Sequence, residues 1–318
     1  MGKSFKSLLA SAAILALCAG SSDAADLEIQ EIIETPNYAG TISGGLMYTW
    51  TDVTGVEGID NDFTEGKEFL STFGEAAALY RFSDTFNLQG DFAFHSHRVE
   101  SIDGCGGCPN KAIDQWHSGG VAFWRDPTMG LFGIDGAWGG IDLGKALDVG
   151  RIGGRGEWFF GEMATLGGGV GYHNLGTGGN NPDLDGVNFN VFVNFYATED
   201  FAIKGKFDYA TFDASQNGKS IDIKAWSFGG EGEYMLRDIF GGGSSVFVGG
   251  RYANFDNDLT GGCCPFSSDT DHAQVFVGFR SYFVTGGSLA NHHRTNTVDN
   301  TNTLLERVPF TPFFGGAP

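Results

Sequence analysis

The chain has 318 residues and a formal net charge of −20, with 19 Lys and Arg residues against 39 Asp and Glu residues. Nucleic acids bind to basic patches, so this balance argues against a DNA or RNA partner. The 51 glycines and 29 phenylalanines favour many strands packed side by side, because helices use less glycine. After the first residues, no run approaches the ~20 apolar residues that a membrane-spanning helix needs.

The first residues have the pattern of an export signal. Lys3 and Lys6 precede an apolar stretch over residues 8–19, and Ser22-Asp23-Ala24 puts small residues at the positions typical of a cleavage site. The apolar stretch is too short to span a bilayer as a helix. We therefore expect residues 1–24 to be a signal peptide that is cleaved after Ala24.

Twelve later segments alternate between apolar and polar side chains with a period of two, as a strand with one apolar and one polar face does. In the clearest of them, Phe86, Leu88 and Phe92 alternate with Asn87, Gln89 and Asp91. Ten or fourteen strands are alternatives, because the Gly-rich stretch 133–156 can be divided differently. The expected strands are 40–50, 69–82, 86–97, 116–125, 131–138, 148–159, 164–173, 187–196, 201–211, 224–234, 245–255 and 272–283.

The connections between these segments alternate in length. Tight turns are expected at 83–85, 126–128, 161–163 and 198–200, and a slightly longer one at 238–243. Long connections are expected at 51–68, 98–114, 174–186 and 256–271. An even number of strands then brings both ends of the strand region to the side with the tight turns. A soluble β-sandwich, the alternative, does not account for this alternation.

The closing segment ends at Phe283, an aromatic residue. With this ending, the region 40–283 resembles a porin-like outer-membrane β-barrel of a Gram-negative bacterium. The resemblance implies an all-β fold, a transmembrane antiparallel up-and-down barrel with short periplasmic turns and longer extracellular loops. It also implies an outer-membrane location, contact with lipid and lipopolysaccharide, and recognition of the closing strand by the barrel-assembly machinery. The family's terminal Phe normally ends the chain, whereas here residues 284–318 follow it and Ser281 occupies a place that is often aromatic.

The alternation sends one set of charged side chains into the barrel lumen, because charges facing hydrocarbon would cost free energy. A narrow aqueous pore lined by these charges is one interpretation. A closed interior held by salt bridges is the other, since acids and bases are balanced. The residues expected to line the pore are Asp91, Asp135, Arg151, Arg155, Glu157, Lys204, Lys206, Glu231, Glu233, Arg251 and Arg280, and Asp208 shares their phase.

Four cysteines remain after the expected cleavage, and an even number in an exported protein favours disulfides. Cys105 and Cys108 lie in the second long connection, and Cys263 and Cys264 in the last. We expect one or two bonds to join these connections across the extracellular mouth, with a zinc site as the alternative. Within the signal, Cys18 allows lipidation, but Leu17 stands where lipoprotein signals have a small residue.

Acidic residues crowd the first and last long connections, Asp52 to Glu65 and Asp256 to Asp271. These carboxylates allow weak binding of Ca²⁺ or Mg²⁺, although no calcium motif is present, and a solvated acidic rim is the simpler interpretation. We expect residues 25–39 to form a short periplasmic lead and 284–318 a flexible periplasmic extension. For the extension, a partner motif or a segment that folds back into the lumen from below is the alternative.

The sequence therefore predicts a channel for passive diffusion of small hydrophilic solutes or ions, with no cofactor and no bound metal. A closed structural or surface-interaction barrel with disulfide-tied acidic loops is the competing hypothesis. A lipid-modifying outer-membrane enzyme is a third and weaker one, because the sequence contains no GxSxG or metalloprotease spacing. We therefore do not expect an enzyme.

Overall fold

The computed structural model describes residues 37–54, 67–99, 112–142, 146–176, 184–216, 219–237, 243–260, 266–283 and 287–298. Within these ranges the chain forms twelve strands and one short helix. The elements are β1 (Tyr38–Thr54), β2 (Lys67–Arg81), β3 (Phe86–Val99), β4 (Ala112–Asp126), β5 (Gly130–Asp142), β6 (Ala146–Phe160), β7 (Ala164–Gly176), β8 (Leu184–Thr198), β9 (Phe201–Gln216), β10 (Lys219–Leu236), β11 (Gly243–Thr260), β12 (Phe266–Tyr282) and α2 (Leu289–Thr295).

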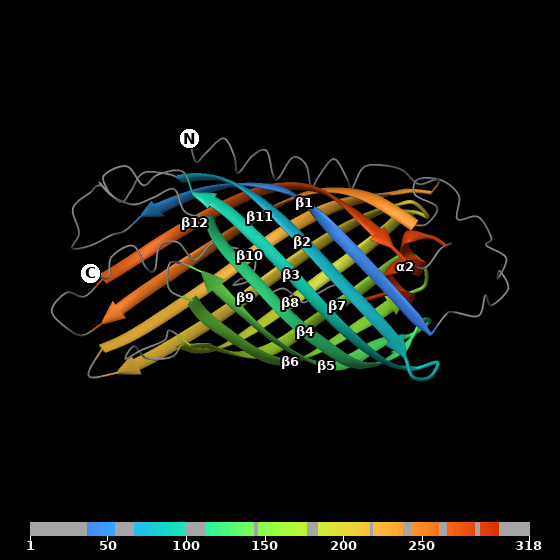
Figure 1. The fold of residues 1–318 in the computed structure, drawn as a ribbon, viewed down its shortest axis with the longest axis horizontal. Coiled ribbons are helices and arrows are strands. Elements are labelled where there is room, and N and C mark those ends of the chain that lie inside the picture. Colours follow the sequence, from blue (N-terminus) through green and yellow to red (C-terminus); the bar gives the residue numbers. More distant parts are fainter. Residues whose placement is uncertain are drawn as a thin grey trace. The chain divides into compact units, whose positions relative to one another are not determined.

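The strands form one closed barrel in which each strand pairs with its sequence neighbours (Figure 1). The ring is closed where β12 pairs antiparallel with β1, with Tyr282 opposite Thr41 and Asp271 opposite Asp52. A closed ladder leaves no edge strand with unpaired backbone groups, which a membrane-spanning sheet requires. The prediction of an all-β, up-and-down, twelve-stranded barrel is confirmed.

The two rims of the barrel differ. One rim, which we call the turn end, carries the tight connections 82–85, 127–129, 161–163 and 199–200 together with the barrel's own first and last strand ends. Gly161 adopts a positive φ of 48° in one of these turns, a conformation that favours glycine. β10 ends and β11 begins at the turn end as well, and the opposite rim, which we call the loop end, is where β1, β3, β5, β7, β9 and β11 end. Figure 1 shows α2 at the turn end.

At the loop end, the strands run further than the sequence pattern predicts. β9 extends to Gln216 and β10 starts at Lys219, so no long loop separates them. The prediction that 256–271 is a loop is wrong, because β11 continues to Thr260 and β12 begins at Phe266. Backbone pairing needs no apolar face, so these ladders continue past the apolar band. The acidic residues expected in that loop, Asp256, Asp258, Asp269 and Asp271, therefore lie on strands.

The outer face of the barrel is apolar. Ile134, Ile152 and Val248 expose more than 60% of their surface, and such large exposed apolar areas mark a lipid or protein contact. Aromatic rings gather near both rims, as in Trp116 with Trp138 towards the loop end and Trp124 with Phe132 towards the turn end. Aromatic side chains prefer the two membrane interfaces. Apolar side chains on the outside exclude the β-sandwich alternative.

The interior holds polar and charged side chains over most of its length, and compact apolar clusters occur at the turn end. Val298 joins Leu79, Phe123 and Phe159 in one cluster, and Leu289 joins Met235 and others in a second. Both clusters include residues that follow the last strand. Among the described residues, no helix is long and apolar enough to cross a membrane.

Candidate functional site: the barrel interior and its C-terminal plug

The charged side chains that the alternation assigns to the lumen lie on the inner face of the wall. Their burial follows from the register, because alternate residues on each strand point inward. Asp91, Asp135, Arg151, Arg155, Lys204, Asp208, Glu233, Arg251 and Arg280 are buried, and Glu157, Lys206 and Glu231 are partly buried.

These charges form ion pairs along the inner face. Arg151 lies 2.8 Å from Asp135, and Arg155 lies 2.8 Å from Glu157. Asp208 pairs with Lys206 at 3.0 Å and with Arg251 at 3.9 Å. His117 lies 3.6 Å from Asp91. The interior is therefore a charged surface in which opposite signs compensate one another locally, and large single-sign fields do not develop.

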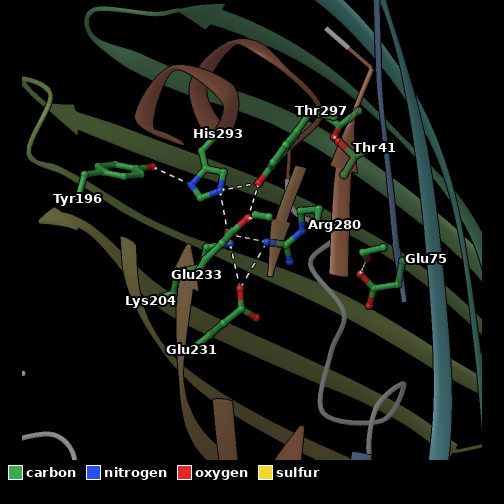
Figure 2. A network of polar contacts seen from close by, with 12 residues as sticks. Thr41, Glu75, Tyr196, Lys204, Glu231, Glu233, Arg280, His293 and Thr297 are labelled. Carbon is green, nitrogen blue, oxygen red and sulfur yellow. Dashed lines mark hydrogen bonds and ion pairs between the residues drawn. The ribbon is translucent and has the colours of Figure 1, made fainter. Parts of the chain in front are cut away.

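Glu233 on β10 is the centre of the densest part of this network (Figure 2). Its side chain has no exposed surface, and its carboxylate accepts hydrogen bonds from Arg280 Nη1 at 2.6 Å and from the Tyr282 hydroxyl at 2.6 Å. Lys204 Nζ lies 2.8 Å from Glu233, and His293 Nε2 lies 3.1 Å from it. A buried carboxylate needs such partners, because an unpaired buried charge is strongly destabilising. One of these partners, His293, belongs to α2.

Residues 287–298, which we call the C-terminal plug, run inside the barrel at the turn end. The backbone of Val298 pairs with the side-chain amide of Gln89, which donates at 3.0 Å and accepts at 2.8 Å. Arg125 Nη1 donates to the Asn296 carbonyl at 2.8 Å, and Arg81 donates to the Thr295 carbonyl. The backbone of the plug is thus hydrogen-bonded to inward-facing side chains of the wall and not to the backbone of a neighbouring strand.

Arg294 fixes the plug to the β6–β7 part of the same rim. Its guanidinium donates to the Ala164 carbonyl at 2.7 Å and to Gly161, and it lies 4.9 Å from the centre of the Phe159 ring. Burial lowers the pKa of Arg294 below its ordinary value, and the neighbouring Tyr196 and acidic residues partly offset this effect. These contacts provide hydrogen-bond acceptors for a charged side chain that is largely shielded from water. Loss of any one of the bonds would therefore reduce the stability of the docked plug.

The two histidines of α2 face the wall. His292 stacks on the Tyr282 ring at 4.6 Å, and burial lowers the pKa of His292 to about 4. His293 lies between the Tyr196 hydroxyl, at 3.2 Å, and Glu233. Ser288 caps the helix by accepting from the backbone N–H of Asn291. Figure 2 shows His293 reaching from α2 into the Glu233 network.

The plug contacts strands around the ring, from Thr41 on β1 to Tyr282 on β12. Leu289 N–H also donates to the Glu199 carbonyl in the β8–β9 turn, at 2.8 Å. For the tail, a segment that folds back into the lumen was one of the alternatives to a flexible extension. Residues 287–298 have this folded-back arrangement. The sequence held one signal for it: Gln89 and Arg125 point inward near the turn end, where each needs a polar partner.

A cavity of about 170 Å³ lies next to the plug, with Thr297 and Val298 in its lining. Charged members of the predicted set line it, namely Asp91, Arg155, Lys204, Lys206, Glu231, Arg251 and Arg280. The structure does not bring Asp135, Arg151, Glu157 or Glu233 to this cavity, although Arg151 lines a small side pocket with His95 and His117. The predicted set is thus divided between the cavity and the surrounding wall.

The inner face also carries aromatic side chains that the alternation does not predict. Phe247 lies 6.1 Å from Phe73 and 6.3 Å from Phe276, ring centre to ring centre. Glycines make room for them: a Cβ at Gly278 would come within 2.4 Å of Phe247, and one at Gly45 within 2.8 Å of Phe73. The tips of the rings therefore occupy the space that a side chain would need at these glycine positions.

The predicted disulfide residues Cys105, Cys108, Cys263 and Cys264 lie outside the described residues. Among the residues that the structure describes, no group of three or more His, Cys, Asp and Glu side chains is arranged to hold a metal ion. The candidate site is therefore the interior itself, with its ion pairs, its cavity and the plug.

Neither a family model nor a curated protein matches the sequence. Among solved structures, the fold is similar to the COG4313 outer membrane channel from Pseudomonas putida F1, with a TM-score of 0.55 and 10% identity over 83% of this chain and 100% of that one. Weaker similarity extends to a Pseudomonas aeruginosa FadL homologue (TM-score 0.41, 8% identity, 79% of this chain and 91% of that one). It also extends to the outer membrane protease OmpT from Escherichia coli (TM-score 0.34, 9% identity, 78% and 97%).

At such low identity, similarity describes the fold and leaves the activity open. It agrees with what the coordinates show independently, an apolar outer face, two aromatic girdles and a charged interior. The resemblance predicted from the alternating segments is confirmed: the chain has the fold of an outer-membrane β-barrel protein.

Proposed function

We propose that this protein is an outer-membrane channel for passive diffusion of small hydrophilic solutes or ions. The observation that carries the proposal is the contrast between the two faces of the wall: apolar side chains outside, and charged side chains around a cavity inside. Charged and amide groups inside a barrel can replace part of the hydration shell of a polar solute. The similarity to the Pseudomonas putida channel adds support at the level of fold.

In this proposal the chain is exported through the signal at residues 1–24, and the turn end faces the periplasm. The closing strand meets β1 at Phe283, whose backbone N–H donates to the Gly40 carbonyl at 2.9 Å and whose ring is exposed. An exposed aromatic residue at the end of the last strand suits recognition by the assembly machinery. The apolar band and aromatic girdles suit contact with lipid and lipopolysaccharide.

The proposed channel is closed at its periplasmic side in the described conformation. The plug takes up the turn end of the lumen and is bonded to the wall on several sides, through Gln89, Arg125, Glu233 and the β6–β7 turn. Conduction then requires the plug to leave its seat. A lumen that opens by release of one segment is an order–disorder transition, one of the usual forms of gating.

A closed structural barrel is the second candidate. The ion pairs of the interior favour it, because Arg151 with Asp135 and Arg155 with Glu157 are contacts that also occur in a filled, non-conducting barrel. The two candidates differ in one property: only the channel conducts when the plug is released.

A reversible cross-link tests the proposal in the full-length chain. Gln89→Cys and Val298→Cys are combined with Cys→Ser changes at positions 105, 108, 263 and 264, and the refolded protein is recorded in planar bilayers. Oxidation should abolish conductance steps, and reduction should restore them. Gln89→Cys alone, in the same background, is the control and should respond to neither treatment.

Two further readings separate the candidates. A folded barrel is recognised by its heat-modifiable mobility on gels, so a variant that has not folded is set aside. Removing residues 287–318 should give frequent, long openings if the barrel is a channel. A folded deletion variant with no conductance would remove the channel proposal and leave the closed barrel.

A further inference from the structure

We propose that the cavity beside the plug is a binding site for a small organic anion that carries a single aromatic ring, such as an aromatic monocarboxylate. The inference rests on the proposed channel function for its biological meaning, because it names a class of solute. The binding site itself depends only on the geometry of the interior, which has an aromatic side, a basic and amide side, and a limited volume.

The aromatic side consists of Phe73 on β2, Phe247 on β11 and Phe276 on β12, with Met47 on β1 beside them. These four strands are consecutive around the ring. Gly45 and Gly278 lie beneath the rings, and any larger residue there would push the rings into the lumen. Together they form a cluster of tilted rings, with Arg280 4.8 Å from the centre of the Phe247 ring, and another ring can pack on such a cluster in an offset or edge-to-face arrangement.

The opposite side of the ring carries hydrogen-bond donors. Arg155 on β6, Asn190 on β8 and Lys206 on β9 all line the cavity, and β6 and β8 are the strands that face β12 and β2 across the barrel. A carboxylate accepts up to four hydrogen bonds and prefers charged donors. A ligand with a ring at one end and a carboxylate at the other would therefore find both its parts matched.

Asn190 is an independent sign of a ligand. Its side chain is 2% exposed and lines the cavity, and among the described residues neither its amide nitrogen nor its amide oxygen has a hydrogen-bond partner. Buried polar groups normally have partners, because leaving one without a hydrogen bond costs free energy. The amide nitrogen of Asn190 is placed to donate to an anion held between it and the aromatic side.

The lining presents more basic than acidic side chains to the cavity. Five basic residues line the cavity against three acidic ones, Glu75, Asp91 and Glu231. Glu157, Asp208 and Glu233 lie outside the lining but pair with these bases, so a bound anion would share the donors with them. The bases in question are Arg155, Lys204, Lys206, Arg251 and Arg280.

The volume is sufficient for one ring. The cavity measures about 170 Å³. An apolar cavity of about 150 Å³ in another protein is known to hold benzene. A compact ring with one carboxylate therefore fits the cavity.

Isothermal titration calorimetry of the full-length, refolded protein in detergent tests the inference, with benzoate as the probe. Acetate supplies the charge without the ring, benzyl alcohol the ring without the charge, and benzylamine the opposite charge. We expect benzoate to bind at least tenfold more tightly than each of the three. Equal affinity for benzoate and acetate, or for benzoate and benzyl alcohol, would overturn the inference.

Variants locate the site. Asn190→Asp changes little in shape but adds a negative charge, and it should weaken benzoate binding more than tenfold. Asn188→Asp makes the same change two residues away on the same strand and outside the cavity lining, and it should stay within twofold of the parent. If Asn190→Asp does not fold, Asn190→Ser and Phe247→Leu serve the same purpose. Unchanged benzoate affinity in the folded variants would contradict the assignment.

The outcomes also separate this inference from the channel proposal. Tight benzoate binding by a barrel that never conducts, even without its plug, would keep the site and remove the channel. A conducting barrel that binds benzoate no better than acetate would keep the channel and remove the site.

Discussion

The two ends of the barrel interior are built differently. At the turn end, charged side chains and the plug meet in one network centred on Glu233. At the loop end, the buried polar groups include histidines bonded to uncharged partners. The bonds are Ser71 to His97 at 2.7 Å, Thr51 to His272 at 2.8 Å and His173 to Asn188 at 2.8 Å.

The difference lies in what each bond connects. Each of those loop-end bonds joins two neighbouring strands, so it adds to the existing ladder and can be lost alone. The turn-end bonds converge on one segment of twelve residues from many strands. Loss of that segment removes all of them together. The strand ladder therefore holds the barrel wall at both ends, whereas only the turn end can lose a whole set of contacts at once, by release of the plug.

The largest expected effect is at Glu233. Glu233→Gln keeps the shape but removes the negative charge shared by Arg280, Lys204 and His293, and breaking a buried ion pair typically costs about 3–5 kcal/mol. We expect the plug to leave its seat, which limited proteolysis of the tail would detect. Glu231→Gln is the matched control, because Glu231 pairs with the same Lys204 and Arg280 but at 3.2 and 3.4 Å and without a plug contact. Equal tail protection in both variants would contradict the central role of Glu233.

Arg294 should come next. Arg294→Met keeps most of the aliphatic stem and removes the donors to Gly161, Ala164 and Thr165, and hydrogen bonds from charged groups are stronger than those between neutral groups. We expect docking of the plug to weaken by about 2–3 kcal/mol, measured as tail proteolysis rates in urea. Arg237→Met removes an exposed pair with Glu199 and Asp200 at the same rim, which should cost about 0–1 kcal/mol. A cost as large for Arg237 would show that the rim, and not the plug seat, dominates.

Acid pH should loosen the plug. The pKa of His292 is about 4 when the plug is docked, against 6.5 for an exposed histidine, so the released plug takes up a proton between these values and the docked one does not. Docking is therefore strongest above pH 6.5 and weakens as the pH falls towards 4. The groups facing His292 are Tyr282, His293 and Glu233; a protonated His293 adds to this effect, and Glu233 opposes it.

A nitroxide at Asn291→Cys, in the background without native cysteines, would report the pH dependence as a gain in mobility between pH 7.5 and pH 5. His292→Phe keeps a ring against Tyr282 and removes the titrating group, so its profile should be flatter. An identical pH profile in the two proteins would exclude His292 as the cause.

A smaller effect is expected halfway along the lumen. Replacing both Arg151 and Arg155 by Ala leaves Asp135 and Glu157 without the cations they pair with here, and the proposed channel should then favour cations. The measurement is a reversal potential across a salt gradient, with a shift of a few millivolts towards cations. A conducting double mutant with the parent's reversal potential would count against a role in selectivity.

The smallest effect on the wall should come from the cysteines. A bond between Cys105 or Cys108 and Cys263 or Cys264 stays a prediction. Entropic theory assigns about 4–5 kcal/mol of stabilisation to a cross-link that closes a chain segment of this length, well over a hundred residues. Because the strand ladder secures the wall, reduction should leave heat-modifiable mobility nearly unchanged and increase protease sensitivity of the loops. Peptide mapping under non-reducing conditions checks the pairing, and a bond between Cys105 and Cys108 alone would refute it.

The sequence pattern was sufficient to predict the strands of the barrel wall but not the side chains and the plug inside the lumen. Alternation predicts β3 and β12 because lipid demands an apolar face at every second residue. The inward face has no such demand, so Phe73 and Phe247 could not be recognised there: their place depends on glycines of other strands. For the plug, the inward-facing Gln89 and Arg125 are the one signal, but no local pattern relates them to the residues that they contact, Val298 and Asn296.

The position of the plug has a consequence for the order of folding. Thr297 touches Thr41 of the first strand, while His293 touches Tyr282 of the last, so the seat exists only after these strands have come together. Docking therefore stabilises the closed ring more than an open sheet, because the contact with Thr41 of β1 is made only in the ring. The plug therefore bridges the two strands that close the barrel. To separate β1 from β12, the contacts of the plug with Thr41 or with Tyr282 must break, which slows unfolding from that edge.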